Sequence, residues 1–268
     1  MTCFICTACG TQFSESLVPP PACAICDDER QFVPETGQQW TDKASISLSH
    51  ELIWKAEAEG ISSLQLAPHF AIGHRAFFIE GPDGNILWDC LSLVDEASVA
   101  RITAAGGLRA VAISHPHFYS SMVEWSAACG GVPIYLHAAD SEWVHRSDPA
   151  LRSWTGETLP LGQATVIRCG GHFTGSSVLH CPWLDDGRGA LFLGDTIQVT
   201  LDRRYVSFMR SYPNLIPLNA PMVKGIVAAV QPYRFEAMYG AFAGRTIESG
   251  GLRVLQRSLE RYVRSIEG

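Results

Sequence analysis

Short apolar runs and stretches with helical periodicity follow one another along most of the chain after residue 62. Apolar runs bounded by glycine, proline or polar residues are typical of strands, and apolar positions three or four apart are typical of helices. The pattern predicts strands over 64–67, 75–80, 85–89, 108–113, 133–137, 166–169, 176–181, 190–194 and 237–240, and helices over 96–105, 122–129, 139–145, 221–230 and 248–266. Strands that alternate with helices indicate a sheet covered by helices on its outside.

Two of these predicted strands, 75–80 and 85–89, are separated by the sequence Gly-Pro-Asp-Gly, which is typical of a hairpin turn. The second strand ends in Asp89. Carboxylates at such positions commonly accept hydrogen bonds from neighbouring loop amides, so a structural role for Asp89 is favoured over a catalytic one.

Two histidines separated by one proline follow the strand predicted over 108–113. Residues just past a buried strand lie at the rim of a sheet, where binding sites are commonly built. Extended backbone at Pro116 would direct the side chains of His115 and His117 to the same side, so that both imidazoles reach one metal ion. Ordinary loop histidines are the alternative, and the pair alone does not decide between the two.

The N-terminal residues 1–36 contain two Cys-x-x-Cys pairs, formed by Cys6, Cys9, Cys23 and Cys26. Two such pairs suit one tetrahedral four-thiolate site, which is structural and holds zinc by default, with iron as the alternative. Cys3 competes with Cys9 as the partner of Cys6, but Gly10 supplies permissive backbone directly after Cys9. A pair of disulfides is the other alternative. The segment resembles the zinc ribbons and rubredoxin-like knuckles.

Residues 37–61 are expected to be a polar linker that ends in a short helix over 51–59, stopped by Gly60. The third predicted unit covers 62–268. A length of 268 residues fits one large domain with a small appendage.

Composition and charge narrow the class of protein further. A formal net charge of −7 without a lysine or arginine cluster argues against nucleic acid and membrane surfaces as partners. The N-terminus lacks the charged start and long apolar run of a signal peptide, so we expect a cytoplasmic protein. In that compartment nine cysteines are expected to be metal ligands and reduced thiols.

Two later stretches add possible ligands to the histidine pair. His172 lies in the glycine-rich sequence Gly-Gly-His-Phe-Thr-Gly-Ser between two predicted strands, and Asp195 follows Gly194 at the end of another. Together with His115 and His117 they make a plausible ligand set for one divalent ion of the zinc or iron type.

The order of elements, the His-x-His sequence, the Gly-His-x-x-Gly-Ser loop and the Gly-Asp-Thr sequence resemble the metallo-β-lactamase superfamily over about residues 62–265. The resemblance implies an α+β fold, a four-layer αββα sandwich with a metal site at one edge between its two sheets, and hydrolytic or related chemistry with metal-activated water. It also implies that His115, His117 and His172 hold the first metal, that Asp195 is the bridging carboxylate, and that Asp89 orders the site loop.

The sequence departs from the superfamily pattern at the second metal. Where the family has His-x-His-x-Asp-His, this chain has Tyr119 and Ser120 in place of the last two ligands, and residues 239–244 lack the final histidine. Asp195 alone would remain for a second ion, so we expect one metal at most. Tyr119, with an ordinary pKa of about 10, is a poor replacement for the missing aspartate as a base.

The function predicted is a metal-dependent hydrolase with one zinc or iron ion that cleaves a small ester, thioester, lactone or amide. Asp195 is expected to bind the ion or accept a proton, and Tyr119 to donate a hydrogen bond to an oxyanion. Substrate contacts are assigned to His137, Arg210 and Tyr212.

Three alternatives stay open. The first is a non-catalytic, metal-containing binding or interaction protein on a degenerate version of the fold. The second is oxidative chemistry at an iron site, and the third is a nucleic-acid role, against which the acidic balance weighs. A small-molecule substrate is the expected partner, and a homo-oligomer is a candidate state.

Overall fold

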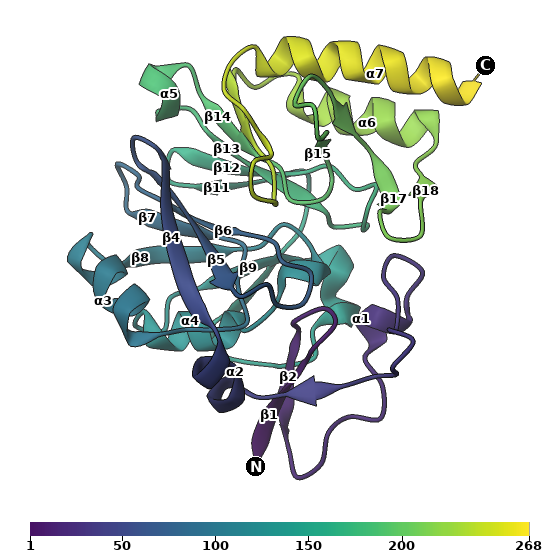
Figure 1. The fold of residues 1–268 in the computed structure, drawn as a ribbon. Helices are drawn as coiled ribbons and strands as arrows, with labels where there is room; N and C mark the ends of the chain where they lie inside the picture. Colours follow the sequence, from purple (N-terminus) through teal and green to yellow (C-terminus); the bar gives the residue numbers. More distant parts are fainter. Residues whose placement is uncertain (268) are drawn as a thin grey trace.

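Two β-sheets stacked face to face form the body of the protein in a computed structural model that describes residues 1–267 (Figure 1). The first sheet has the strand order β10-β9-β8-β7-β6-β5-β4. Its strands are β4 (Glu51–Ala58), β5 (Ile61–Ala67), β6 (Ala76–Ile79), β7 (Asn85–Trp88), β8 (Leu108–Ala112), β9 (Ile134–His137) and β10 (Leu151–Trp154). Neighbours from β4 to β7 are antiparallel, and those from β7 to β10 are parallel.

The second sheet has the order β11-β12-β13-β14-β19-β20 and is antiparallel except between β14 and β19. Its strands are β11 (Thr158–Leu161), β12 (Ala164–Arg168), β13 (Ser177–Cys181), β14 (Ala190–Phe192), β19 (Ala237–Tyr239) and β20 (Thr246–Ile247). The segment between β14 and β19 contains two short hairpins, β15 (Gln198–Val199) with β16 (Val206–Ser207) and β17 (Met209–Ser211) with β18 (Ile216–Pro217).

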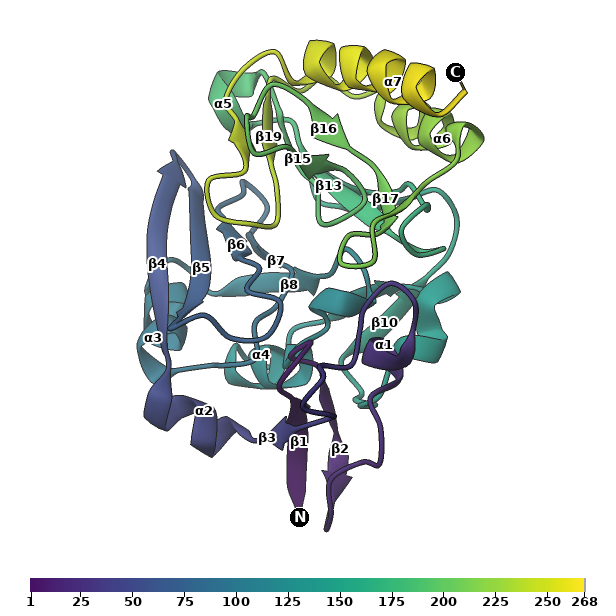
Figure 2. The same ribbon diagram turned by 45° about the vertical axis from the view of Figure 1, so that its right-hand side comes forward.

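Helices cover the outer face of each sheet, as Figures 1 and 2 show. The helices are α1 (Ala24–Asp27), α2 (Lys43–Ser49), α3 (Glu96–Ala104), α4 (Met122–Ala128), α5 (Leu184–Gly187), α6 (Ala220–Val230) and α7 (Gly251–Glu267), with 3-10 turns at Pro116–Phe118 and Ala138–Trp143. The side chains of Asp95 and Asn219 accept hydrogen bonds from backbone amides in the first turns of α3 and α6, which explains where these helices begin. Within the described residues no helix has the length and apolar character to cross a membrane.

Three apolar layers separate the four layers of secondary structure. Alternate residues of a strand point to opposite faces, so Phe78 and Leu87 pack under α3 and α4, while Phe77 and Trp88 face the second sheet. Beyond the second sheet, a third cluster that includes Val178 packs against α6 and α7. The predicted α+β fold, a four-layer αββα sandwich, is therefore confirmed.

The N-terminal residues form a small separate sheet, in which β1 (Thr2–Cys6) pairs with β2 (Gln12–Ser16) and with β3 (Trp40–Thr41). A cluster of buried cysteines and Ile25 forms its core. We call residues 1–41 the ribbon. The ribbon lies against the end of the sandwich, near the 3-10 turn Ala138–Trp143 and the hairpin formed by β17 and β18 (Figure 2).

Most of the predicted elements from residue 62 onward are present, including the hairpin at Gly81–Gly84 between β6 and β7. The helix predicted over 51–59 is wrong, because these residues form strand β4, which pairs with β5 around Gly60. The linker predicted over 37–61 is wrong too, since β3 belongs to the ribbon and β4 to the first sheet. The helix predicted over 139–145 is a 3-10 turn instead.

Candidate metal centre

Strand β8 ends at Ala112 and delivers His115 and His117 to the edge between the two sheets. The two sheets meet there directly, because the Ser177 amide donates to the Ser114 carbonyl (2.9 Å). His115 is extended, but Pro116 begins a 3-10 turn, so the predicted extended backbone at Pro116 is wrong. The two imidazoles nevertheless come together, with ring centres 5.1 Å apart, because the turn bends His117 back towards His115.

Hydrogen bonds select which nitrogen is free in two of the three histidines, His115 and His172. Nδ1 of His115 is bonded to Ser114 Oγ (2.8 Å), and Nδ1 of His172 donates to the Met209 carbonyl (3.2 Å). Nε2 of His172 then lies 3.2 Å from Nδ1 of His117, and Nε2 of His115 lies 3.5 Å from Oδ2 of Asp195. Ligands on a tetrahedral zinc ion with bonds of about 2.0–2.1 Å lie about 3.3 Å apart, close to both distances.

Asp195 reaches this group because Gly194 allows strand β14 to end very close to strand β8. A Cβ atom at Gly194 would lie 2.6 Å from the Ser114 side chain, and the residue has φ +55°. Only glycine adopts both that backbone and that approach without displacement. The Gly-Asp-Thr sequence therefore places its carboxylate opposite the histidine pair.

Asp89 supports the site from beneath. Its carboxylate accepts a hydrogen bond from the Ser114 amide (2.8 Å), one residue before His115, and it is completely enclosed. This contact agrees with the loop-ordering role expected for Asp89. Asp140 acts in the same way on the His172 loop, because its Oδ1 accepts from the Gly175 amide (2.7 Å). Sequence reasoning missed Asp140, whose partner is distant in the chain.

Four ligand atoms from His115, His117, His172 and Asp195 lie within 4.8 Å of one another. Burial lowers the pKa of His115 and His172 to about 3 and keeps the pKa of His117 well below its usual value, so the imidazoles are neutral. Nε2 of His115 and Oδ1 of Asp195 are enclosed and have no hydrogen-bond partner among the described residues. Unpaired buried donors and acceptors are costly, and a divalent cation would satisfy them, so the residues fit a metal.

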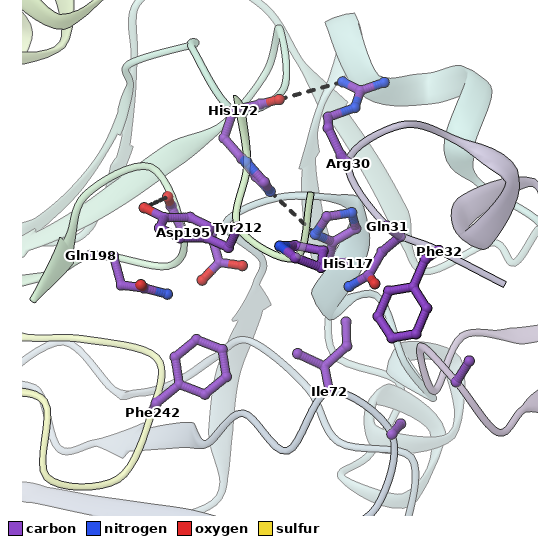
Figure 3. A pocket seen from close by; sticks show the side chains of 13 residues that line it. Arg30, Gln31, Phe32, Ile72, His117, His172, Asp195, Gln198, Tyr212 and Phe242 are labelled. Carbon is purple, nitrogen blue, oxygen red and sulfur yellow. Dashed lines mark hydrogen bonds between the residues drawn. The ribbon is translucent and has the colours of Figure 1, made fainter. Parts of the chain in front are cut away.

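The group opens into a cavity of about 250 Å³ (Figure 3). Its walls combine His117, His172 and Asp195 with apolar side chains and two amides; the other lining residues are Ala8, Arg30, Gln31, Phe32, Ala71, Ile72, Gln198, Tyr212, Pro213 and Phe242. Tyr212, assigned to substrate contact from the sequence, lies in this wall, and its hydroxyl donates to the Asp195 carbonyl (3.0 Å).

Three other residues proposed for the site point elsewhere. The Tyr119 hydroxyl donates to the Asp140 carbonyl (3.4 Å), and Tyr119 does not line the cavity, which contradicts its assignment as an oxyanion donor. Both ring nitrogens of His137 are bonded to backbone atoms of Gly156 and Ala139. Arg210 forms an ion pair with Glu29 of the ribbon. Local packing of each side chain, which the sequence does not show, causes these differences.

The second predicted metal group is present in the ribbon. Sulfur atoms of Cys6, Cys9, Cys23 and Cys26 lie within 4.8 Å of one another, and the pairs Cys6–Cys26 and Cys9–Cys23 are 3.6 Å apart. A disulfide requires about 2.05 Å, whereas sulfurs on a tetrahedral zinc ion lie about 3.7 Å apart. Cys3 lies outside the group, as expected from the pairing of Cys6 with Cys9. The four thiols fit a metal.

The cavity also contains residues that sequence reasoning missed, above all Arg30, Gln31 and Phe32 of the ribbon. Nothing in their local sequence marks them as site residues. Phe242 lies in the loop 239–244, where the sequence showed only that the final histidine of the superfamily pattern is missing. The two glycines that flank it, Gly240 and Gly244, were the available signal for a loop of unusual shape.

A relative in sequence covers nearly the whole chain. The chain is 42% identical over 269 residues to an uncharacterized protein, YmaE, from Bacillus subtilis (strain 168), with 99% of this chain and 97% of YmaE covered. The chain belongs to the YmaE family. The match spans the residues of both the ribbon and the sandwich. No protein-family model matches the chain.

Solved structures identify the fold of this YmaE-family chain. The metallo-β-lactamase DIM-1 superposes with a TM-score of 0.58 at 14% identity, covering 81% of this chain and 98% of DIM-1. The metallo-β-lactamase FIM-1 from Pseudomonas aeruginosa, in its mono-zinc form, superposes with a TM-score of 0.56 at 16% identity, covering 78% and 95%. The fold is thus that of the metallo-β-lactamases, as the sequence motifs predicted.

Proposed function

We propose that the protein is a metal-dependent hydrolase with a single ion at the centre formed by His115, His117, His172 and Asp195, acting on a small ester, thioester, lactone or amide. The observation that carries the proposal is the convergence of four enclosed ligand atoms, two of them without a partner, at the floor of a cavity. Zinc is the proposed ion at both metal groups, with iron as the alternative.

Each side chain of the proposed centre has a separate role in holding the ion or moving a proton. His115 and His172 hold the ion through Nε2, because their Nδ1 atoms are bonded to Ser114 and Met209, and His117 holds it through Nδ1, which faces Nε2 of His172. When bound, the ion supplies Lewis acidity and makes water acidic enough to provide a nucleophile near neutral pH. Oδ1 of Asp195, which lacks a partner, completes the ligand set or accepts a proton. Ile72 and Phe242 give the cavity apolar surface.

One ion rather than two is supported by what surrounds the departures from the superfamily motif. The Ser120 carbonyl accepts a hydrogen bond from the Gln12 amide of the ribbon (3.1 Å), and Tyr119 lines a small cleft beside Thr11 and Gln12. Positions that carry second-metal ligands in the superfamily here contact the ribbon. FIM-1 in its mono-zinc form shows that a related fold is also found with one zinc.

Replacing His172 by alanine tests the proposal. We expect the wild type to contain about two metal ions per chain, one of them released only by a thiol-reactive reagent. The His172→Ala variant is expected to keep the ribbon ion, to lose the other, and to lose at least about 100-fold in turnover of a panel of p-nitrophenyl esters, thioesters and lactones. Elemental analysis and initial rates measure both quantities.

His50→Ala is the matched control, because His50 does not line the cavity and its ring nitrogen is bonded to the side chain of the neighbouring Ser49. It should retain both ions and full turnover. Unchanged metal content and turnover in His172→Ala would disprove the proposal. Ribbon metal alone in the wild type would instead favour the non-catalytic binding protein.

A further inference from the structure

The ribbon also contributes to the cavity, because Arg30, Gln31 and Phe32 of its segment 28–32 form one wall (Figure 3). This segment begins two residues after the metal-binding Cys26, and the Gln31 amide donates to the Asp28 carbonyl (2.9 Å), which closes a turn. Ala8, between Cys6 and Cys9, lines the same cavity. Both cysteine knuckles therefore present residues to the candidate active site.

Two sets of contacts hold the segment against the sandwich. The Arg30 guanidinium lies over the Phe173 ring (3.8 Å) and the Trp143 ring (5.0 Å), is paired with Asp28, and donates to the carbonyl of His172 (3.4 Å). On the opposite side, the Asn214 amide donates to the carbonyls of Glu29 (2.9 Å) and Gln31 (2.8 Å). The segment thus bridges the loop that carries His172 and the loop that carries Tyr212.

Phe32 stands at the mouth of the cavity with 51% of its surface exposed. Such exposure of a large apolar side chain beside a metal centre is explained if a ligand covers it, because burying its ring against an apolar group is favourable. Ile72 and Phe242 provide further apolar surface, and the amides of Gln31 and Gln198 are uncharged. The Arg30 guanidinium also lines the cavity, but its charge is paired with Asp28. At about 250 Å³ the cavity is smaller than typical sites for drug-sized ligands, of about 300–1,000 Å³.

We propose that ribbon residues Arg30, Gln31 and Phe32 form the substrate-recognition wall and that Phe32 is a specificity-determining residue, which selects substrates whose acyl group carries an apolar, uncharged alkyl chain. The inference rests on the proposed function and narrows it to small esters or thioesters of such acids. Carboxylates with an alkyl tail are suitable probes, since the carboxylate reaches the metal centre and the tail reaches Phe32.

The test compares acetate, butyrate and hexanoate binding to the metal-loaded full chain by isothermal titration calorimetry. We expect hexanoate to bind at least about tenfold more tightly than acetate to the wild type, and Phe32→Ala to reduce that ratio by about fivefold. Leu17→Ala is the matched control, since Leu17 is an apolar ribbon residue with 85% exposure that does not line the cavity. It should keep the wild-type ratio.

A ratio that is unchanged in Phe32→Ala, a ratio reduced equally by Leu17→Ala, or no preference for hexanoate in the wild type would each overturn the inference. Hydrolysis of the matching p-nitrophenyl esters is measured separately. Absence of turnover together with a Phe32-dependent preference would reject the proposed hydrolase while retaining the recognition wall, so the two failures are distinguishable.

Discussion

Asp89 stabilises the backbone from which the histidine pair starts. Its carboxylate is fully enclosed and accepts a hydrogen bond from the Ser114 amide, while its own φ is +62°. Burial raises the pKa of Asp89 to about 8, although the hydrogen bonds with Ser114 oppose the shift. The folded protein therefore keeps this carboxyl group protonated at pH values where an unfolded chain has ionised it.

Asp89→Asn should remove this pH dependence. In the unfolded chain the carboxyl group loses its proton near pH 3.9, about four pH units below the folded value, so its contribution is complete below about pH 4 and is lost as pH rises through about 8. The asparagine variant keeps an acceptor oxygen for Ser114 but cannot ionise. Measured by urea unfolding at pH 5, 6.5 and 8, its stability should rise relative to the wild type as pH increases. A constant difference across the series would contradict the shifted pKa.

At the scale of elements, the metal centre is built where strand ends approach closely. Strands β8 and β14 belong to different sheets, and the loop after β12 carries His172 between them. At Gly194 the backbone after β14 lies so close to Ser114, after β8, that a Cβ atom would be 2.6 Å from the serine side chain. The geometry of the ligands therefore depends on Gly194, where a side chain would clash and where the φ angle is positive.

Gly194→Ala is expected to weaken metal binding at the centre by at least about tenfold, because a Cβ atom would push Asp195 away from His115. Gly187→Ala is its matched control, since Gly187 also has a positive φ (+74°) but has open space around the added carbon. Both variants should lose about 1–2 kcal/mol of stability from backbone strain. Competition with a chelator measures the affinity; equal affinities in the two variants would contradict the role of Gly194.

At the scale of the molecule, Arg75 joins the two sheets through an enclosed guanidinium group. It donates to the carbonyl of Gly240 (2.9 Å) and to the hydroxyl of Thr246 (3.0 Å) in the second sheet, and forms an ion pair with Glu57 of the first (2.9 Å). Its side chain is 1% exposed, whereas Lys55, the other partner of Glu57, is 65% exposed. Glu57 therefore pairs with one buried cation, Arg75, and with one exposed cation, Lys55.

Arg75→Met should destabilise the protein by about 3–5 kcal/mol, because it removes the enclosed partner of Glu57 and leaves the Gly240 carbonyl without the Arg75 donor. Lys55→Met, which removes an exposed partner of the same carboxylate, should cost about 1 kcal/mol or less. Urea unfolding compares the two variants directly. Similar losses in both would show that Arg75 contributes no more than a surface ion pair.

The ribbon also connects distant parts of the molecule. Its Gln12 amide donates to the Ser120 carbonyl of the sandwich, and its residues 30–32 line the cavity. The same small unit therefore contacts the segment after His117 and supplies one wall of the candidate site.

The sequence by itself determined the chemistry and the order of the elements. Four cysteines in two pairs, the His-x-His pair, His172 and Asp195 are recognisable because ligand type and local spacing suffice to mark them. Alternation of strands and helices predicted the layered sandwich for the same reason, since periodicity is a local property. The error at β4 arose because the short segment 51–59 lacks a clear period and takes its conformation from pairing with β5.

Only the tertiary structure decided where the ribbon lies, that Tyr119 points away from the cavity, that Arg210 pairs with Glu29, and that Phe32 stands beside the metal centre. Each of these facts depends on packing between segments far apart in the chain. Side-chain direction and docking follow from the shape of the partner surface, which no local pattern of residue types encodes. The candidate ligands can thus be identified from the sequence, whereas the cavity that they face is formed only by the fold.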